Sequence, residues 1–169
     1  MVSRPGKIAP VIPPEPTKVK VALVGDSQVG KTSFCKGFKD NFTTEYEPTI
    51  GSDFYSKTIK TTKGLYQFNF WDLSGGQDYI EVRNEFYKES QALVIMFDIT
   101  RKQSFDALDM WLREASKHDG EKLPVIVIGN KADLSSNRKV QKSEAEKWVK
   151  ARNFAGYFET SPKDGNGYI

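Results

Sequence analysis

The sequence is short of the side chains that build disulfides and transition-metal centres. It has one cysteine, Cys35, and one histidine, His118, so an intramolecular disulfide is excluded and a zinc site is not expected. We expect Cys35 to act as a small buried hydrophobic residue and His118 to lie exposed at a helix end. Long apolar runs are also missing: those at 92–97 and 125–128 have the length of a buried strand, well below the roughly 18 residues that cross a bilayer.

Neither sign of charge dominates the chain. Lysine and arginine number 25, aspartate and glutamate 22, and the net charge is +3, with the basic residues scattered along the sequence. So small an excess does not indicate nucleic acid as the partner.

Targeting signals are also missing from both ends of the sequence. The N-terminus has no apolar stretch of the secretory type, and Met1-Val2 excludes N-myristoylation. The last residues, 167–169, contain no cysteine that could be prenylated. We therefore expect no direct lipid anchor, and a location in the cytoplasm or the nucleus.

Proline is concentrated at one end of the chain. Five of the eight prolines lie within residues 1–17, so we expect an extended flexible tail there. Residues 18–169 have the length of one ordinary domain. With 38% apolar and 28% charged residues, the composition is typical of a globular protein, which we expect to be a monomer.

From Lys18 onward, apolar strands alternate with amphipathic helices. The pattern predicts strands at 19–24, 55–62, 65–71, 92–98, 125–128 and 154–159, and helices at 31–40, 82–89, 105–112 and 145–149. The second and third strands alternate with period two on either side of 62–64, which predicts a hairpin. Continuous apolar strands separated by helices indicate an α/β fold of three layers. Its sheet of about six strands is mostly parallel, and the hairpin adds one antiparallel edge strand. Trp111 and Trp148 are expected on helix faces that pack on this sheet.

A glycine-rich phosphate-binding motif follows the first predicted strand. Residues 25–32 fit the pattern G-x-x-x-x-G-K-[ST] between a strand and a helix, the context that this motif requires. Backbone N–H groups of such a loop point at phosphate oxygens, and the helix N-terminus adds partial positive charge. Lys31 would reach the outer phosphates and the Thr32 hydroxyl would bind Mg²⁺. The phosphate-binding residues predicted here are Gly25, Asp26, Ser27, Gln28, Val29, Gly30, Lys31 and Thr32.

A second motif, Asn130-Lys131-Ala132-Asp133, indicates which base is bound. It follows a buried strand, at the edge of the sheet where open α/β sheets bind ligands. The Asp133 carboxylate can accept hydrogen bonds from both N1–H and the 2-amino group of guanine. Adenine offers no such pair of donors, so a buried carboxylate would stay unpaired against it. The two motifs together predict a site for GTP or GDP with Mg²⁺.

With these motifs the chain resembles the Ras-like small GTPases over about residues 18–169, which implies their P-loop fold. Residues 46–51 resemble the first switch of that family, and residues 71–75 resemble the second. The resemblance implies that Thr49 completes the Mg²⁺ shell and senses the γ-phosphate, that Asp72 holds Mg²⁺ through water, and that the N–H of Gly75 binds the γ-phosphate. Effectors and regulators are then expected at residues 42–52 and 72–88.

The resemblance also supplies further contacts for the base. It implies that Phe42 lies against the face of the guanine, beside Asn130, Lys131 and Asp133. Residues Ser161, Pro162 and Lys163 stand where the family has a serine-alanine-lysine loop. Because Pro162 replaces the alanine, one backbone N–H is lost, and a lost hydrogen bond lowers affinity by roughly 0.5–1.5 kcal/mol.

Two stretches point to a particular branch of these proteins. Residues 81–88 and 104–109 look like those of the RJL branch, Ras-like proteins without lipidation signals, some of which carry a J domain after the GTPase. Ras-like domains also end with a helix that packs across the sheet, and this chain stops about where that helix begins. The resemblance therefore implies that the last helix is missing and that apolar surface on the sheet and the first helix is uncovered.

One departure from the family pattern bears on catalysis. Most relatives read D-x-x-G-Q, with the glutamine orienting the attacking water. Here the spacing from Asp72 to Arg83 is unchanged, so Gly76 occupies the glutamine position and Gln77 comes one place late. Gly76 has no side chain to hold water, and two successive glycines give a flexible loop. We expect weak or absent GTP hydrolysis, unless Gln77 swings back as a substitute.

Three functions remain open at this point. The first is a guanine-nucleotide switch whose loops around Thr49 and Gly75 are ordered by the γ-phosphate. The second is an interaction scaffold that keeps GTP as a structural ligand without hydrolysing it, which Gly76 favours. The third is a P-loop enzyme that uses ATP, against which Asp133 argues.

Overall fold

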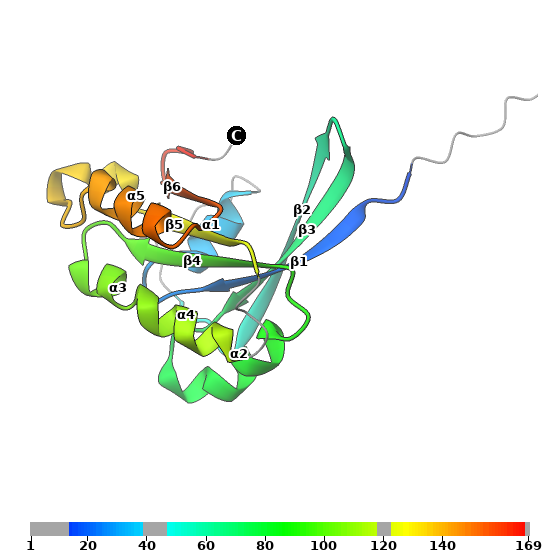
Figure 1. Cartoon of the computed structure of the whole chain (residues 1–169), viewed down its shortest axis with the longest axis horizontal. Coiled ribbons are helices and arrows are strands. Elements are labelled where there is room, and N and C mark those ends of the chain that lie inside the picture. The colour runs from blue at the N-terminus through cyan, green and yellow to red at the C-terminus, as the bar shows by residue number, and fades with distance from the viewer. Residues whose placement is uncertain (1–13, 39–46, 118–122, 168–169) are drawn as a thin grey trace, which may run out of the picture.

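A six-stranded β-sheet forms the centre of the computed structural model, which describes residues 14–38, 47–117 and 123–167 (Figure 1). The strand order is β2-β3-β1-β4-β5-β6. The strands are β1 (Thr17–Val24), β2 (Ser52–Thr61), β3 (Gly64–Leu73), β4 (Ala92–Asp98), β5 (Val125–Asn130) and β6 (Gly156–Thr160). Every neighbouring pair is parallel except β2 and β3. The α/β fold with six strands and one antiparallel edge strand is therefore confirmed.

The hairpin of β2 and β3 turns where the sequence pattern places it. Thr61 pairs with Gly64, which leaves Thr62 and Lys63 as a two-residue turn. Gly64 has a φ of 139°, a backbone conformation that favours glycine. The hydroxyl of Thr61 accepts a hydrogen bond from the Lys63 N–H at 3.1 Å. β2 begins three residues earlier than predicted and ends one residue earlier, whereas β3 extends beyond both predicted bounds, because backbone pairing continues past the residues that alternate in polarity.

The helices lie in the connections between strands. They are α1 (Lys31–Gly37), α2 (Ile80–Tyr87), α3 (Lys102–Asp106), α4 (Leu108–Ser116) and α5 (Lys142–Ala151), with the 3₁₀ helices η1 (Gln77–Tyr79) and η3 (Ala132–Asn137). α1 begins at Lys31, as predicted, and Gly37 is its last residue. The helix expected at 105–112 is divided between α3 and α4, which meet at Ala107. Neither 3₁₀ helix was predicted, because both are too short to show an apolar period.

Two apolar clusters fill the spaces on the two faces of the sheet. Side chains of β4 alternate between them: Leu93, Ile95 and Phe97 belong to one cluster, Val94 and Met96 to the other. The first cluster takes side chains from α2, α3, α4 and α5, and the second takes side chains from α1. This alternation explains why a strand covered on both faces reads as a continuous apolar run.

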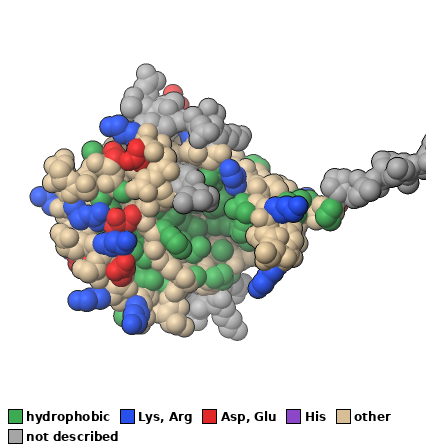
Figure 2. Space-filling view, turned by 90° about the horizontal axis from the view of Figure 1, so that it is seen from above, with side chains coloured by type: hydrophobic (Ala, Val, Ile, Leu, Met, Phe, Trp, Pro, Cys, Tyr) green, Lys and Arg blue, Asp and Glu red, His purple; other side chains and the backbone are tan. Residues whose placement is uncertain are grey.

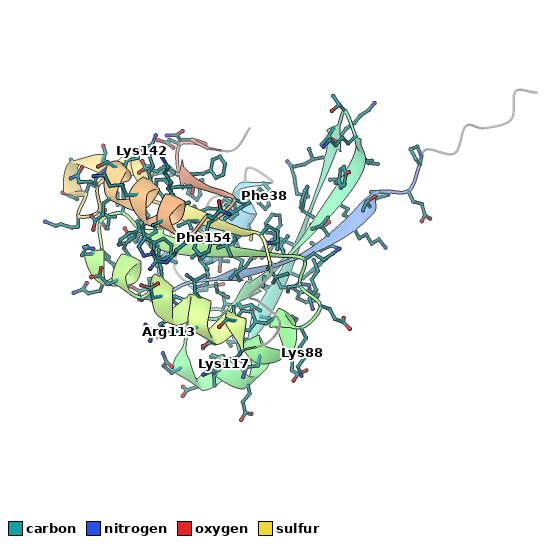
Figure 3. The ribbon with its side chains drawn as sticks, in the orientation of Figure 1. Phe38, Lys88, Arg113, Lys117, Lys142 and Phe154 are labelled. Carbon is teal, nitrogen blue, oxygen red and sulfur yellow. The ribbon has the colours of Figure 1, made fainter. Side chains whose placement is uncertain are left out.

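The tryptophan and cysteine predictions are confirmed by burial. Trp111 is 1% exposed in the first cluster, and Trp148 packs against that cluster. Figure 3 labels Arg113, on the same helix as Trp111, and Lys117, directly after that helix; both residues are exposed to solvent. Cys35 is 1% exposed in the second cluster, and burial raises the pKa of its thiol well above the usual range.

The cluster under α1 is only partly covered. Phe38, labelled in Figure 3, directly follows α1 and packs its ring against Phe34 and Phe70, with 5.0 Å between ring centroids in each pair. Figure 2 shows hydrophobic side chains in a hollow between the β2–β3 hairpin and the side of the molecule that is rich in charged residues. Within the described residues, no helix is both long enough and apolar enough to cross a membrane.

Candidate functional site

A cavity of about 700 Å³ lies where five separate segments of the chain converge. Twelve residues predicted for the site line it: Ser27, Gln28, Gly30, Lys31, Thr32, Thr49, Gly75, Asn130, Lys131, Asp133, Pro162 and Lys163. Other predicted residues, Gly25, Asp26, Val29, Asp72 and Ser161, lie behind this lining. Phe42 and His118 fall outside the described residues. The cavity therefore unites the phosphate motif and the base motif, which are about 100 residues apart.

The phosphate motif forms the tight loop between β1 and α1 that its glycines predict. Gly25 and Gly30 have φ values of 146° and 95°. A Cβ at Gly25 would collide with the Met96 carbonyl, and a Cβ at Gly30 would collide with the Asn130 side chain. Both positions therefore require glycine for conformation and for space. Gln28 adopts a φ of 67° without being glycine.

Lys31 places its ammonium group under this loop. The side chain is buried, and Nζ donates hydrogen bonds to the carbonyls of Gly25 and Asp26 at 2.6 and 3.0 Å. Burial lowers the pKa of Lys31 to about 8, although the nearby carboxylates of Asp72 and Asp26 act in the opposite direction. A cation held this way beside a cavity is poised to contact an anionic group that enters it.

Three oxygen-bearing side chains meet beside Lys31. The Thr32 hydroxyl donates to Asp72 Oδ2 at 2.5 Å and lies 3.0 Å from the Thr49 hydroxyl. Asp72 is fully buried, and its second oxygen, Oδ1, has no hydrogen-bond partner among the described residues. Burial raises the pKa of Asp72, because the charged form is poorly solvated there. Hydroxyl and carboxylate oxygens are the ligands that Mg²⁺ prefers, and an unpaired buried carboxylate oxygen suits a cation.

The base motif is braced by contacts to other segments. Asn130 donates through Nδ2 to the Val29 carbonyl at 2.9 Å and accepts from the Thr160 hydroxyl at 3.0 Å. It therefore ties the phosphate loop to β6. Asp133 accepts from the Ser161 hydroxyl at 2.8 Å through Oδ1, and Asp133 also lines the cavity. Asn130 and Ser161 act here as supports for the residues beside them.

The two glycines after β3 differ in whether the structure leaves room for a side chain. A Cβ at Gly75 would lie 2.5 Å from the Ser27 nitrogen and 2.7 Å from the Gly25 carbonyl oxygen, so only glycine fits. Gly76 has φ −73° and ψ 145°, and a Cβ there would lie 3.2 Å from the Tyr79 ring. Gln77 begins η1 with an exposed side chain and does not line the cavity.

The architecture and this cavity agree with the match to known proteins. The model of the Ras family matches residues 20–168. The chain belongs to the Ras family. The resemblance inferred from the phosphate and base motifs is thereby confirmed, as is the P-loop fold that it implied.

Relatives of this Ras-family chain include Rab7 proteins and J-domain-type proteins. It is 36% identical over 150 residues to "Ras-related protein Rab-7a" of Paramecium octaurelia, covering 86% of this chain and 73% of that protein. It is 37% identical over 156 residues to "DnaJ homolog subfamily C member 27" of Danio rerio, covering 89% of this chain and 57% of that protein. The second match agrees with the branch expected from residues 81–88 and 104–109.

Sequence reasoning missed a polar network behind the cavity of this Ras-family domain. Trp111, predicted as core, donates its indole N–H to Asp26 Oδ1 at 2.8 Å. Arg83 is fully buried and pairs with Glu114 through two hydrogen bonds of 2.6 and 2.9 Å. A signal existed, because Arg83 stands four residues before the buried Tyr87 on the same helix face, and a buried arginine requires an acidic partner.

Proposed function

We propose that this chain is a guanine-nucleotide switch that binds Mg²⁺ with GTP or GDP. Proteins of the Ras family bind guanine nucleotides, and the family match extends over nearly the whole chain. The observation that carries the proposal is the single cavity lined by Lys31, Thr49, Gly75 and Asp133. These residues offer a cation, a hydroxyl, a backbone N–H and a base-selective carboxylate to one bound molecule.

The groups around Asp72 fit the metal that the family implies. Thr32 and Thr49 would contribute hydroxyl oxygens to Mg²⁺, and Asp72 would hold it through water. The buried, unpaired Oδ1 of Asp72 supports this role. When bound, Mg²⁺ would neutralise phosphate charge. Lys31 and the backbone N–H groups of the loop would then orient the phosphates against the start of α1.

The base would be read from the opposite end of the cavity. The carboxylate of Asp133 can accept from both N1–H and the 2-amino group of guanine, since its two oxygens offer about four acceptor sites and Ser161 takes one of them. Lys131 and Lys163 line the same cavity as Asp133, and Phe42 is proposed to lie against the base. Pro162 also lines it and has no N–H to donate, so one base contact common in the family is absent.

Hydrolysis of GTP is proposed to be slow. Attack by water on the γ-phosphate depends on positioning, because the protein supplies little covalent chemistry. Gly76 has no side chain for this purpose, and the exposed residue Gln77 does not line the cavity. The chain would hold GTP in place while leaving the attacking water unoriented, so the GTP state would persist.

The surface beside the cavity supports a role in binding protein partners. Ile50 is 81% exposed and Phe54 is 48% exposed. Phe54 packs on Trp71, and Trp71 packs on Phe86, with centroids 5.0 and 4.7 Å apart. This aromatic row runs between the segment that carries Thr49 and helix α2. Partners that bind across residues 47–52 and 72–88 could therefore sense both segments at once.

A second candidate is a scaffold that keeps GTP permanently. The absence of a side chain at Gly76 favours the scaffold, because a protein that does not hydrolyse its bound GTP stays in the GTP form. The two candidates differ in whether a partner, or the surface around Thr49, distinguishes the GTP form from the GDP form.

Nucleotide analysis of the purified full chain tests the proposal. Protein denatured after purification should release GDP or GTP, identified by chromatography, and labelled GDP should bind in the presence of Mg²⁺. Excess GTP should displace the label and excess ATP should not. An Asp133→Ala variant should lose guanine binding while keeping its fold. Equal competition by ATP would refute the guanine assignment.

A further inference from the structure

Asp98 is a buried carboxylate that lies beside the base motif without lining the cavity. It is the last residue of β4 and is 1% exposed. The strand register places it directly opposite Asn130, the last residue of the neighbouring strand β5 (Figure 1). The Ile99 N–H donates to the Asn130 carbonyl at 3.1 Å, which joins the ends of the two strands. Lys131, the next residue after Asn130, therefore begins next to Asp98.

Both carboxylate oxygens of Asp98 have partners. Oδ1 accepts from the N–H of Thr100 at 2.8 Å and from its hydroxyl at 2.6 Å. Oδ2 lies 2.6 Å from the ammonium nitrogen of Lys131. A buried carboxylate requires such partners, because burial removes its hydration. The contacts with Thr100 fix one oxygen, so the second oxygen has a defined position for the ammonium of Lys131.

This ion pair determines which part of Lys131 is available to a ligand. Lys131 lines the cavity, and its side chain is 32% exposed. Its ammonium is paired with a carboxylate outside the cavity lining, so the methylene stem is the part that remains for a ligand. Lysine stems commonly cover apolar surface while the charged end binds elsewhere. The flat face of a purine is a suitable surface for such a stem.

The two lysines Lys31 and Lys131 have different partners in this site. Lys31 donates to the backbone carbonyls of Gly25 and Asp26, which carry no net charge. Lys131 is paired instead with the full negative charge of Asp98. An opposite charge this close cancels most of the attraction that Lys131 would exert on a more distant anion. The pair is therefore expected to affect the base rather than the phosphates.

We propose that Asp98 is a positioning residue for nucleotide binding. It holds the ammonium of Lys131 and thereby fixes the stem of Lys131 along the cavity, where the stem contacts the face of the base. Asp133 binds the edge of the base directly, whereas Asp98 acts through Lys131. This inference rests on the proposed function, since it concerns how the same site binds the base.

A double-mutant cycle on the full chain tests the inference. Dissociation constants for a fluorescent GDP are measured with Mg²⁺ for Asp98→Asn, Lys131→Met and the double variant. Each single change should weaken GDP binding by about tenfold, because either one releases the stem. The double variant should also be weakened by only about tenfold, since the pair is already broken. A loss of about a hundredfold in the double variant, the product of the single effects, would overturn the inference.

A second nucleotide separates an effect on the base from an effect on the phosphates. The same variants are measured with a poorly hydrolysed GTP analogue. The loss of affinity should agree with that for GDP within about twofold, because both nucleotides carry the same base. A loss about fivefold or more larger with the analogue would overturn the inference, since Lys131 would then act on the third phosphate.

Ser104→Ala is the matched control for a disturbed turn. Ser104 is fully buried, and its hydroxyl accepts from the Asp98 N–H at 3.0 Å and donates to the Arg101 carbonyl at 2.7 Å. This variant weakens the turn after β4 and leaves the Asp98 carboxylate and Lys131 unchanged. Its Tm should fall, while its affinity for GDP should change by less than about twofold. A loss of affinity as large as that of Asp98→Asn would overturn the inference, because the stability of the turn would explain both.

Lys131→Arg keeps the inference testable if Asp98→Asn does not fold. Arginine retains a cation that can pair with the Asp98 carboxylate, whereas methionine does not. The Lys131→Arg variant should therefore bind GDP about threefold or more tightly than Lys131→Met. Equal affinities in these two variants would overturn the role of Asp98.

Nucleotide binding by the natural chain is measured first, so that the two claims can fail separately. A chain that binds neither guanine nucleotide would overturn the proposed function together with this inference. A chain that binds both nucleotides, and in which the losses from Asp98→Asn and Lys131→Met multiply, would overturn the inference alone.

Discussion

Replacing Gly76 with glutamine tests how far the missing side chain at this position limits GTP hydrolysis. The backbone at Gly76 has φ −73° and ψ 145°, an extended conformation open to every L-residue. A Cβ there would lie 3.2 Å from Cδ2 of Tyr79 and 3.6 Å from Oγ of Ser74. The Tyr79 ring therefore has to move by only a few tenths of an ångström. We expect the variant to fold, with a change in stability of about 1 kcal/mol or less.

The expected effect on the reaction is much larger. Arg83 donates a hydrogen bond to the Gly76 carbonyl and so fixes the backbone at this position. The fixed backbone sets the direction in which a side chain at position 76 would leave it. Tyr79 and Ser74, its nearest neighbours, both line the cavity, so the new glutamine amide would enter the cavity beside the proposed γ-phosphate position. Orienting one water is expected to raise the rate by about a hundredfold, equivalent to about 2.7 kcal/mol in the barrier.

Single-turnover hydrolysis of GTP loaded on the protein is the assay. The Gly76→Gln variant should release phosphate about a hundred times faster than the natural chain, at an unchanged affinity for GDP. Gln77→Ala is the control, because the exposed Gln77 side chain does not line the cavity and its removal should leave the rate unaltered. The reasoning is refuted if the natural chain already hydrolyses GTP as fast as the Gly76→Gln variant. It is refuted equally if Gln77→Ala abolishes hydrolysis, since Gln77 would then be the substitute.

Three further outcomes are expected. Asp133→Asn should change the preferred base from guanine to xanthine by about tenfold or more. The amide oxygen can accept from both the Ser161 hydroxyl and N1–H, while the new Nδ2–H₂ can donate to the 2-carbonyl of xanthine. Competition of XDP and GDP against labelled nucleotide measures this preference, and continued preference for GDP would count against the base contact. Chelation of Mg²⁺ should weaken GDP binding by about tenfold or more in the natural chain, and it should have little effect in Asp72→Asn, whose metal site has lost its charge. Titrations of GDP with and without EDTA measure this difference. Equal sensitivity to EDTA in both proteins would exclude Asp72 from the metal site. Cys35 should resist a thiol reagent until the chain unfolds, since the thiol is buried with a raised pKa; rapid labelling of the folded chain would show that α1 opens readily.

Much of the fold was predictable because its signals are local. The apolar run of β4, flanked by amphipathic helices, predicts a strand covered on both faces, and its residues do alternate between the two clusters. The turn at Thr62 and Lys63 was predictable from the change in pattern around Gly64. Short elements without a period were not predictable, which is why η1, η3 and the division at Ala107 were missed.

The site was predictable to the extent that its motifs are continuous in sequence. The spacing of Gly25, Gly30 and Lys31 requires a tight loop before a helix, and that loop is present. The behaviour of the two later glycines was not predictable. Gly75 is confined by contact with the phosphate loop, and Arg83 holds the carbonyl of Gly76, so the flexibility expected of a glycine pair is restrained by partners that are distant in sequence.

The amino-acid order alone settles what each segment can do: which residues alternate, which turn requires glycine, and which carboxylate can select guanine. These properties depend on neighbours a few residues away in the sequence, so they do not depend on how the helices and strands are arranged. The tertiary arrangement determines which distant side chains contact each other. Arg83 reaches Glu114 across 31 residues because α2 packs against α4. Trp111 reaches Asp26 across 85 residues because the fold brings α4 next to the loop between β1 and α1. No local pattern encodes such partners, since they follow from strand order and helix packing.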